Sequence, residues 1–238
     1  MEDGVREAVL KFPDPEGVRE IVTVPEAAFI RQRDILPWEM LHSATVTVIG
    51  TGAVGSFTAL SLVKMGVGTV EVYDHDTVSV ENLGPQWFRI CDLGRPKVEA
   101  LAEQLAAFGG NVVAHPEKFV AQPVSGIVVA TVDSMDARIT IWRHIRKTRR
   151  VELYLDARMG AEVGKVFAIR PQDPEDCRAY ETELYPSTEA FRAPCTARST
   201  IYCAAGLSAF LSATVGNHLA GRRYRRDLVV DFRQGIIM

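Results

Sequence analysis

The sequence VTVIGTGAVGSFTALSLVKMG at residues 46–66, followed by TVEVYD at 69–74, decides the fold of this chain. It has the pattern of a β-branched strand, a glycine-rich turn, a helix that stops at a glycine, and a second strand that ends in an acid. The turn has the spacing G-x-G-x-x-G, made by Gly50, Gly52 and Gly55. Between a strand and a helix, this spacing predicts a nucleotide-binding turn.

The chemistry of phosphate binding explains the residue types in this turn. The first glycine permits the tight turn, the second lets a phosphate approach the backbone, and the third lets helix and strand pack closely. The helix N-terminus offers free N–H groups and a partial positive charge to the anion. Asp74 ends the second strand, where it can accept hydrogen bonds from ribose hydroxyls. The turn does not choose the nucleotide, so an NAD-dependent oxidoreductase is still open at this point.

Strands and helices alternate through the rest of the chain. Further strands are predicted at 111–115, 126–131, 151–157 and 164–169, and helices at 96–108, 136–148 and 201–220. This alternation favours an α/β, Rossmann-like fold: a mostly parallel sheet with helices on both faces, extended by an antiparallel portion. Residues 1–24 predict an N-terminal β-hairpin, and residues 25–41 a short helix leading into the sheet. Residues 171–200 hold four prolines and many acids, which predicts an irregular crossover loop.

The composition excludes several classes of protein. The 238 residues carry 27 Lys and Arg against 30 Asp and Glu, giving a net charge of −3, and 47% are hydrophobic. These values exclude a disordered or fibrous chain and disfavour a dedicated DNA-binding protein. The four cysteines form no C-x-x-C pair, so no zinc site is predicted. We expect a cytoplasmic protein without a membrane span, because the N-terminus has no apolar signal core and 201–220 contains polar residues.

Three further segments narrow the choice of nucleotide. They are DHDTVSVENLGPQ at 74–86, LGRPKVEA at 93–100 and VDSMDAR at 132–138. On these segments the chain resembles the ubiquitin-activating-enzyme-like family, the ThiF/MoeB adenylyltransferases, over roughly residues 28–220. The family patterns are D-x-D-x-V-x-x-x-N-L-x-R-Q, G-x-P-K-V-E and D-N-x-x-x-R. The resemblance implies a ThiF-type adenylation domain over residues 25–238.

The resemblance also implies ATP and Mg²⁺ as cofactors and assigns residues to them. It places Asp76, Asn82 and Lys97 beside the nucleotide, and makes Asp133 a catalytic residue and Mg²⁺ ligand. Adenylation develops charge on the α-phosphate and on departing pyrophosphate, which Mg²⁺ and fixed cations stabilise. The residues alone leave alternatives: Lys97 as a surface lysine, Asn82 as a turn residue, and Asp133 as the cap of the following helix.

One position departs from the family pattern. Pro85 stands where the family has a phosphate-contacting arginine, and Arg89, about one turn later, is a candidate to replace it. Arg31 and Gln32 resemble the family's N-terminal R-Q pair, whose arginine reaches the γ-phosphate in the partner subunit. This implies a homodimer in which Arg31 is catalytic across the interface. The alternative is an exposed helix arginine.

Family members that pass the acyl group onward use a cysteine on the crossover loop. The segment APCTARSTIY at 193–202 resembles that region, which implies a thioester at Cys195. The nearby helix N-terminus and Arg198 would lower its thiol pKa. Cys177, on the same predicted loop, is the second candidate. Cys203 is expected to be a packed core thiol, and Cys91 carries no catalytic signal.

The implied function is ATP-dependent adenylation of the C-terminal carboxylate of a ubiquitin-like or sulfur-carrier protein that ends in glycine. Thioester formation and a downstream conjugating or sulfur-transfer enzyme would follow. One alternative is adenylation of a peptide, a small molecule or tRNA without a thioester. Another is an NAD-binding oxidoreductase or an inactive nucleotide-binding scaffold. The basic runs at 143–150 and 222–226 are interpreted as solvated surface, with contact to tRNA or to the acidic face of a carrier protein as the alternatives. Neither a nucleic acid nor a membrane is expected as a partner.

Overall fold

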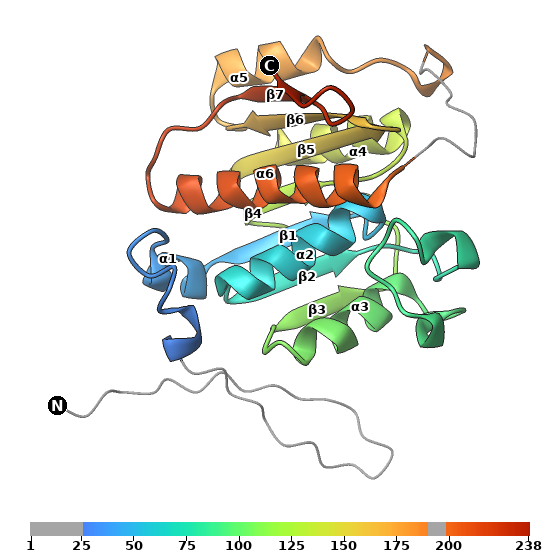
Figure 1. The fold of residues 1–238 in the computed structure, drawn as a ribbon. Helices are drawn as coiled ribbons and strands as arrows, with labels where there is room; N and C mark the ends of the chain where they lie inside the picture. The colour runs from blue at the N-terminus through green and yellow to red at the C-terminus, as the bar shows by residue number, and fades with distance from the viewer. Residues whose placement is uncertain (1–25, 190–198) are drawn as a thin grey trace, which may run out of the picture.

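An eight-stranded sheet runs through the computed structural model, which describes residues 26–189 and 199–238 (Figure 1). The strand order is β3-β2-β1-β4-β5-β6-β7-β8. The strands are β1 (Thr45–Ile49), β2 (Thr69–Tyr73), β3 (Val112–His115), β4 (Gly126–Ala130), β5 (Val151–Gly160), β6 (Val163–Ile169), β7 (Asp227–Asp231) and β8 (Ile236–Ile237). The strands from β3 to β5 pair in parallel, and β6, β7 and β8 are antiparallel. The predicted fold class is confirmed, while the hairpin predicted at 1–24 lies outside the described residues.

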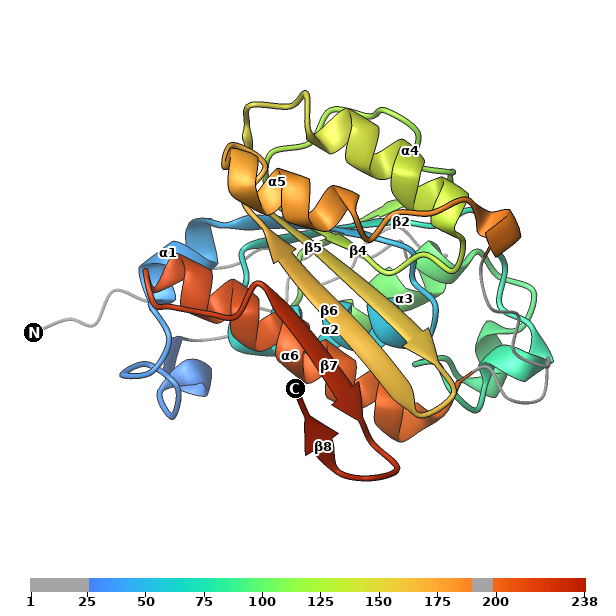
Figure 2. The same ribbon diagram turned by 90° about the horizontal axis from the view of Figure 1, so that it is seen from above.

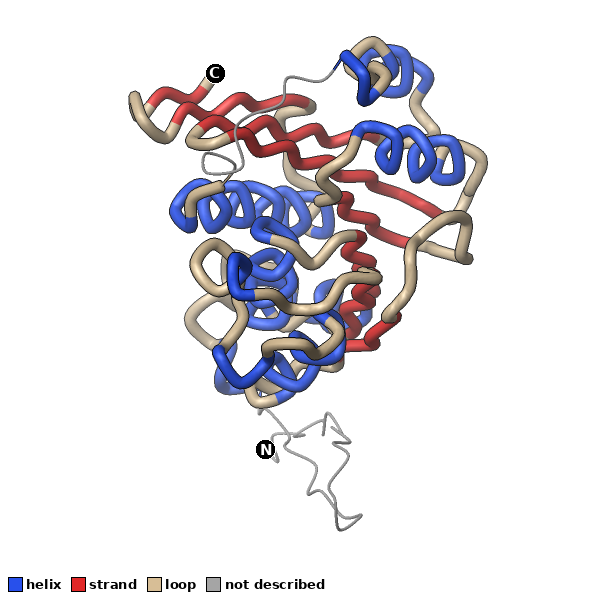
Figure 3. The backbone as a smooth tube through the Cα atoms, turned by 90° about the vertical axis from the view of Figure 1, so that its right-hand side faces the viewer, coloured by secondary structure: helices blue, strands red, loops and turns tan. Residues whose placement is uncertain are grey.

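Helices cover both faces of this sheet. The α-helices are α1 (Trp38–Ser43), α2 (Ala53–Met65), α3 (Lys97–Ala106), α4 (Met135–Ile145), α5 (Pro174–Glu181) and α6 (Ile201–Leu219). The short 3₁₀ segments are η1 (Glu26–Phe29), η2 (Val80–Asn82), η3 (Ile90–Asp92) and η4 (Ser187–Glu189). Helices α2, α3 and α6 pack on one face, and α4 and α5 on the other (Figures 2 and 3).

The alternation of side chains along the central strands creates two cores. In β1, Val48 belongs to the cluster under α2 and α6, and Ile49 to the cluster under α4 and α5. In β4, Val129 and Val128 divide in the same way. Parallel strands buried on both faces need such continuous apolar runs, which is why the sequence shows β-branched stretches here. The central strands are therefore buried on both faces, and their carboxyl ends lie along one edge of the sheet.

The crossover segment is more regular than predicted. The side chain of Asp173 accepts hydrogen bonds from the backbone N–H groups of Glu175 and Asp176, and Pro174 begins the helix, so α5 forms here. The prediction of an irregular loop over 171–200 is wrong for these residues. Proline favours the first turn of a helix as well as loops, and an aspartate directly before it is a strong N-cap.

The helix predicted at 201–220 is α6, which lies beside α2 in Figure 1. Leu207, Leu211 and Val215 are fully buried on its inner face. In the ranges 26–189 and 199–238, no helix combines the length and hydropathy needed to cross a membrane. Strands β7 and β8 follow α6 and were not predicted individually, because both are short; β7 pairs with the distant β6, and β8 has only two residues and pairs with β7.

Candidate functional site

The glycine turn between β1 and α2 lies at the carboxyl edge of the parallel strands. Gly50 has a φ of +91°, and a Cβ there would lie 3.0 Å from the carbonyl oxygen of Thr131. A Cβ on Gly55 would lie 1.9 Å from the carbonyl oxygen of Gly50. A Cβ on Gly52 would meet nothing within 4 Å. Gly50 and Gly55 are therefore required by the turn itself, whereas the backbone at Gly52 faces open space.

Asp74 braces the glycine turn from the β2 side. One carboxylate oxygen accepts hydrogen bonds from the backbone N–H of Thr51 at 2.7 Å and from its hydroxyl at 3.1 Å. The other oxygen accepts the backbone N–H of Asp76 at 3.0 Å. The sequence predicts that Asp74 binds ribose. The geometry adds a second task, because the same carboxylate fixes the turn on which a phosphate would rest.

Lys97 begins α3 and points back toward this acidic corner. Its Nζ donates to Asp76 at 2.9 Å, and its side chain is only 7% exposed. The alternative of a solvated surface lysine is therefore wrong. Partial burial raises the pKa of the Asp76 carboxyl, but the hydrogen bond and charge of Lys97 outweigh this and hold it below its usual value. The buried Lys97 ammonium is therefore bound to Asp76, and the backbone N–H of Asp76 is bound in turn by Asp74, the acid that holds the glycine turn.

The segment between β2 and α3 covers the first turn of α2. The backbone N–H of Trp87 donates to the Ser56 hydroxyl at 3.0 Å, and Ser56 belongs to that first turn. Asn82 closes η2, since its amide oxygen accepts the N–H and hydroxyl of Ser79, both at 3.0 Å. Its predicted phosphate contact stays a prediction, and the turn role is present beside it.

Arg89 is engaged by carboxylates in this structure. Its guanidinium donates to Asp92 at 3.1 and 2.9 Å and to Glu103 at 3.4 Å. Asp92 is fully buried and also accepts from Arg95 and Gln104. Burial raises the pKa of Asp92, but the hydrogen bonds from Arg89 outweigh this effect and hold the pKa below its usual value. Arg89 therefore anchors this segment, and the substitution for the arginine missing at Pro85 stays a prediction.

Asp133 is exposed and lies three residues after the end of β4. The alternative that it caps the following helix is wrong, because Ser134 caps α4 by accepting the N–H of Ala137 at 3.2 Å. The loop leading to Asp133 packs directly on the glycine turn: the Thr131 hydroxyl donates to the Gly50 carbonyl at 2.6 Å. The structure thus brings Asp133 to the same edge as Gly50, Asp74 and Lys97.

Arg31 lies at the other end of α2. Its neighbour Gln32 donates to the carbonyls of Met65 at 3.2 Å and Lys64 at 3.3 Å, in the last turn of that helix. A helix of 13 residues is ~20 Å long. The exposed Arg31 side chain is therefore not part of the site in its own chain. A catalytic role for it needs a second chain.

The cysteines differ sharply in environment. Cys195 lies outside the described residues. Cys177 is buried within α5, its thiol donates to the Pro171 carbonyl at 3.4 Å, and burial raises its pKa. It does not have the exposed, electropositive setting of a nucleophile. Cys203 is fully buried, and burial raises its pKa to about 11, as expected of a core thiol. Cys91 is exposed.

The donor atoms at this edge suit a hard divalent cation. Asp74, His75 and Asp76 offer ligand atoms within 4.8 Å of one another, and Asp133 adds an exposed carboxylate across the glycine turn. Carboxylate oxygens are the ligands that Mg²⁺ prefers, and it keeps several waters and contacts substrate phosphates. The residues present therefore fit Mg²⁺ bound together with a nucleotide.

Several residues of the site carried no sequence signal. Thr131 and Ser56 act through contacts between segments distant in sequence. Two buried side-chain atoms near the first turn of α2, Gln86 Oε1 and Trp87 Nε1, have no hydrogen-bond partner in the described part of the chain.

The fold and this edge define a nucleotide-binding α/β protein of the Rossmann-like class. Residues 27–223 match the model of the ThiF family, and the chain belongs to that family. It is 34% identical over 76 residues to ubiquitin-like modifier-activating enzyme 5 of Arabidopsis thaliana, a match covering 32% of this chain and 18% of that protein. It is 28% identical over 135 residues to the rat protein of the same name, covering 48% and 33%. The chain thus matches a third or less of the length of these two relatives.

Solved structures share the fold at low sequence identity. MccB of E. coli, determined with AMPCPP and MccA, has a TM-score of 0.69 at 15% identity, covering 89% of this chain and 70% of that one. The tRNA N6-threonylcarbamoyladenosine dehydratase TcdA of E. coli has a TM-score of 0.64 at 17% identity, covering 82% and 95%. PaaA has a TM-score of 0.69 at 16% identity, covering 89% and 68%.

Proposed function

We propose that this chain adenylates the C-terminal carboxylate of a ubiquitin-like or sulfur-carrier protein, using ATP and Mg²⁺. The observation that carries the proposal is the direct packing of the glycine turn on the loop that leads to Asp133, through Gly50 and Thr131. This contact holds a phosphate-binding backbone and an exposed carboxylate on one edge. Membership of the ThiF family and the similarity to activating enzymes support the choice of reaction.

The residues divide the work of adenylation among them. A carboxylate oxygen of the carrier attacks the α-phosphorus, the bond to the β-phosphate oxygen breaks, and pyrophosphate leaves. The N–H groups at the start of α2 bind phosphate oxygens over Gly52, and Lys97 neutralises charge on the departing group. Asp74 binds ribose, and Asp133 would hold Mg²⁺ beside the phosphates. Mg²⁺ supplies Lewis-acid stabilisation of the phosphate charge.

A thioester at Cys195 is the second step of the proposal: the thiolate attacks the acyl carbon and AMP leaves. The residues on either side of 190–198 support it by their position. Ser187 exchanges hydrogen bonds with Asp136 in the first turn of α4, at 3.1 and 3.4 Å. Ser199 pairs with Ala161 in the β5–β6 turn. Both anchors lie on the carboxyl side of the sheet, as Asp133 does.

The proposal includes a homodimer in which Arg31 serves the partner's nucleotide, because Arg31 lies too far from the site of its own chain. Complementation tests this. Arg31→Ala and Asp133→Ala should each abolish adenylation alone. A mixture should recover about a quarter of wild-type activity, since half the dimers are mixed and each restores one of two sites. No recovery, in a mixture shown to exchange subunits, would refute action across the interface.

A second candidate function is adenylation of a peptide without a thioester. The similarity in fold to MccB, whose structure was determined with MccA, supports it as an alternative. ATP–pyrophosphate exchange with candidate carriers, followed by a non-reducing gel, separates the two. Exchange together with a thiol-labile adduct that Cys195→Ser removes supports the carrier function. Exchange without such an adduct favours the peptide alternative. Tight NAD binding without exchange for any carboxylate would refute both.

A further inference from the structure

A buried carboxylate lies directly behind the loop that carries Asp133. Asp156, in β5, is fully buried. It forms ion pairs with Arg138 of α4 and with Arg158, whose Nε donates at 2.9 Å, and it accepts the Tyr180 hydroxyl of α5 at 3.0 Å. Figure 2 shows how α4 and α5 cover this part of the sheet. One carboxylate therefore joins three elements.

Arg138 has two acceptors, and they lie in different segments. It donates through Nη1 to Asp156 and through Nη2 to the backbone carbonyl of Val132. The residue is only 5% exposed. Val132 directly precedes Asp133, so the planar fork of Arg138 ties the loop to the buried carboxylate. A lysine ammonium is a single point donor and cannot reproduce this two-way fork.

The same loop is held on its opposite side by the glycine turn. Thr131 donates its hydroxyl to the Gly50 carbonyl at 2.6 Å, and its backbone N–H to the Ile49 carbonyl at 2.8 Å. Thr131 and Val132 are thus fixed from two directions. Asp133 is the next residue, and its own side chain is exposed.

A buried ion pair adds little net stability over an apolar pair of similar volume, because the cost of desolvation offsets the attraction. This ion pair instead fixes the orientation of the Arg138 guanidinium, which binds the Val132 carbonyl. We propose that Arg138, oriented by Asp156, is the positioning residue that fixes Asp133 against the glycine turn. The proposal rests on the function proposed above, in which Asp133 holds Mg²⁺ beside the nucleotide.

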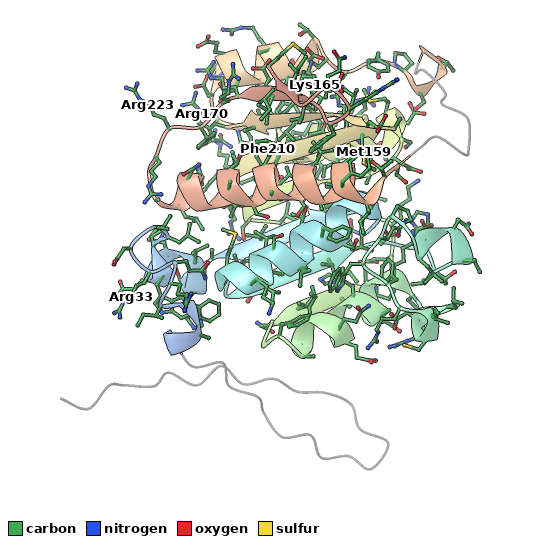
Figure 4. The ribbon with its side chains drawn as sticks, in the orientation of Figure 1. Arg33, Met159, Lys165, Arg170, Phe210 and Arg223 are labelled. Carbon is green, nitrogen blue, oxygen red and sulfur yellow. The ribbon has the colours of Figure 1, made fainter. Side chains whose placement is uncertain are left out.

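The chain offers a matched control at the other end of the sheet. Asp176 is 3% exposed and is likewise bound by two arginines: Arg170 donates to it at 2.7 Å and Arg226 at 2.9 Å. Figure 4 labels Arg170, which lies on the side of the molecule where α6 ends. Asp176→Asn therefore disturbs a comparable buried pair that does not contact the loop of Asp133.

The test measures binding of α,β-methylene-ATP, in which the bond broken by adenylation cannot be cleaved, by calorimetry with and without Mg²⁺. Wild type, Arg138→Lys, Arg138→Met, Asp133→Ala and Asp176→Asn are compared, with a thermal melt of each. The Lys variant keeps the buried charge, so it tests the fork if the Met variant does not fold. Partners behind a metal ligand change metal affinity by about 10- to 100-fold. Mg²⁺ should increase the affinity for the nucleotide about 10- to 100-fold less in both Arg138 variants than in wild type. Their affinity for the nucleotide without Mg²⁺ should stay within about twofold of wild type.

Asp176→Asn should lower the melting temperature but keep the full Mg²⁺-dependent gain. If Arg138→Lys keeps the gain while Asp133→Ala loses it, the positioning role is refuted and the proposed function stands. If Asp133→Ala itself keeps the gain, Asp133 does not hold Mg²⁺, and the function proposed for this site is refuted together with the role of Arg138. If Asp176→Asn loses the gain equally, the effect is general destabilisation and the positioning role is refuted.

Discussion

Replacement of Gly55 by alanine tests the geometry of the glycine turn with a single methyl group. That methyl would lie 1.9 Å from the Gly50 carbonyl oxygen and 2.5 Å from the Thr131 hydroxyl. Carbon and oxygen atoms in contact lie ~3.3 Å or more apart. The turn must therefore move by more than ~1 Å away from the helix. The nearest blocking atom is the backbone carbonyl oxygen of Gly50, which cannot yield unless the turn itself moves.

The expected loss has two parts. Overpacking of a rigid site costs about 1–3 kcal/mol, and loss of the Thr131 hydrogen bond to Gly50 adds about 1 kcal/mol. We expect Gly55→Ala to lower the free energy of unfolding by about 2–4 kcal/mol, measured by urea denaturation. The displaced turn should also fail to bind MgATP.

Gly52→Ala is the matched control, because its added Cβ meets nothing within 4 Å and its φ is −72°. Its stability should stay within about 0.5 kcal/mol of wild type, while the methyl hinders a phosphate on the open side of the turn. If Gly55→Ala is as stable as Gly52→Ala, the close packing described for the turn is wrong. If Gly52→Ala binds MgATP as wild type does, the phosphate does not rest there.

Two further predictions concern charge and thiols. Lys97 lowers the pKa of Asp76, so the stability it supplies is present above the usual carboxyl pKa of 3.8 and is lost as the pH falls below it. The stability deficit of Lys97→Met against wild type should therefore shrink between pH 5 and pH 3 in urea titrations, and a constant deficit would contradict the ion pair. Iodoacetamide at about pH 8 should label Cys91 in the native protein but neither Cys177 nor Cys203, whose burial raises their pKa. Peptide mass spectrometry locates the label, and Cys177 reacting as fast as Cys91 would contradict its packing.

Local signals in the sequence predicted the central part of the fold. The helix predicted between the glycine turn and Gly66 is α2 (Ala53–Met65), and Gly66 ends it in the left-handed region at φ 89°. The parallel strands follow their β-branched runs because burial on both faces demands them. The N-terminus of α5 shows where prediction from local sequence signals fails. Asp173-Pro174 has the chemistry of a helix start, yet proline also suggests a loop, and only packing decides between them.

The sequence predicted which residues lie at the site, but not which hydrogen bonds they make. Spacing alone could not decide whether Asp133 or Ser134 caps α4, since either residue type can serve. The carboxylate of Asp92, three residues after Arg89, was a visible local competitor for that guanidinium. The hydrogen bond from the Thr131 hydroxyl to the Gly50 carbonyl joins residues 81 positions apart. Only the register of β1 beside β4 brings them together, and the sequence pattern does not contain that register.

The most direct test of the proposed site is a crystal structure of the protein with Mg²⁺ and α,β-methylene-ATP. We expect phosphate oxygens on the backbone N–H groups at the start of α2, beside Gly52, with ribose at Asp74 and Mg²⁺ contacting Asp133. A nucleotide bound elsewhere, or Mg²⁺ that leaves Asp133 without a contact, would contradict it.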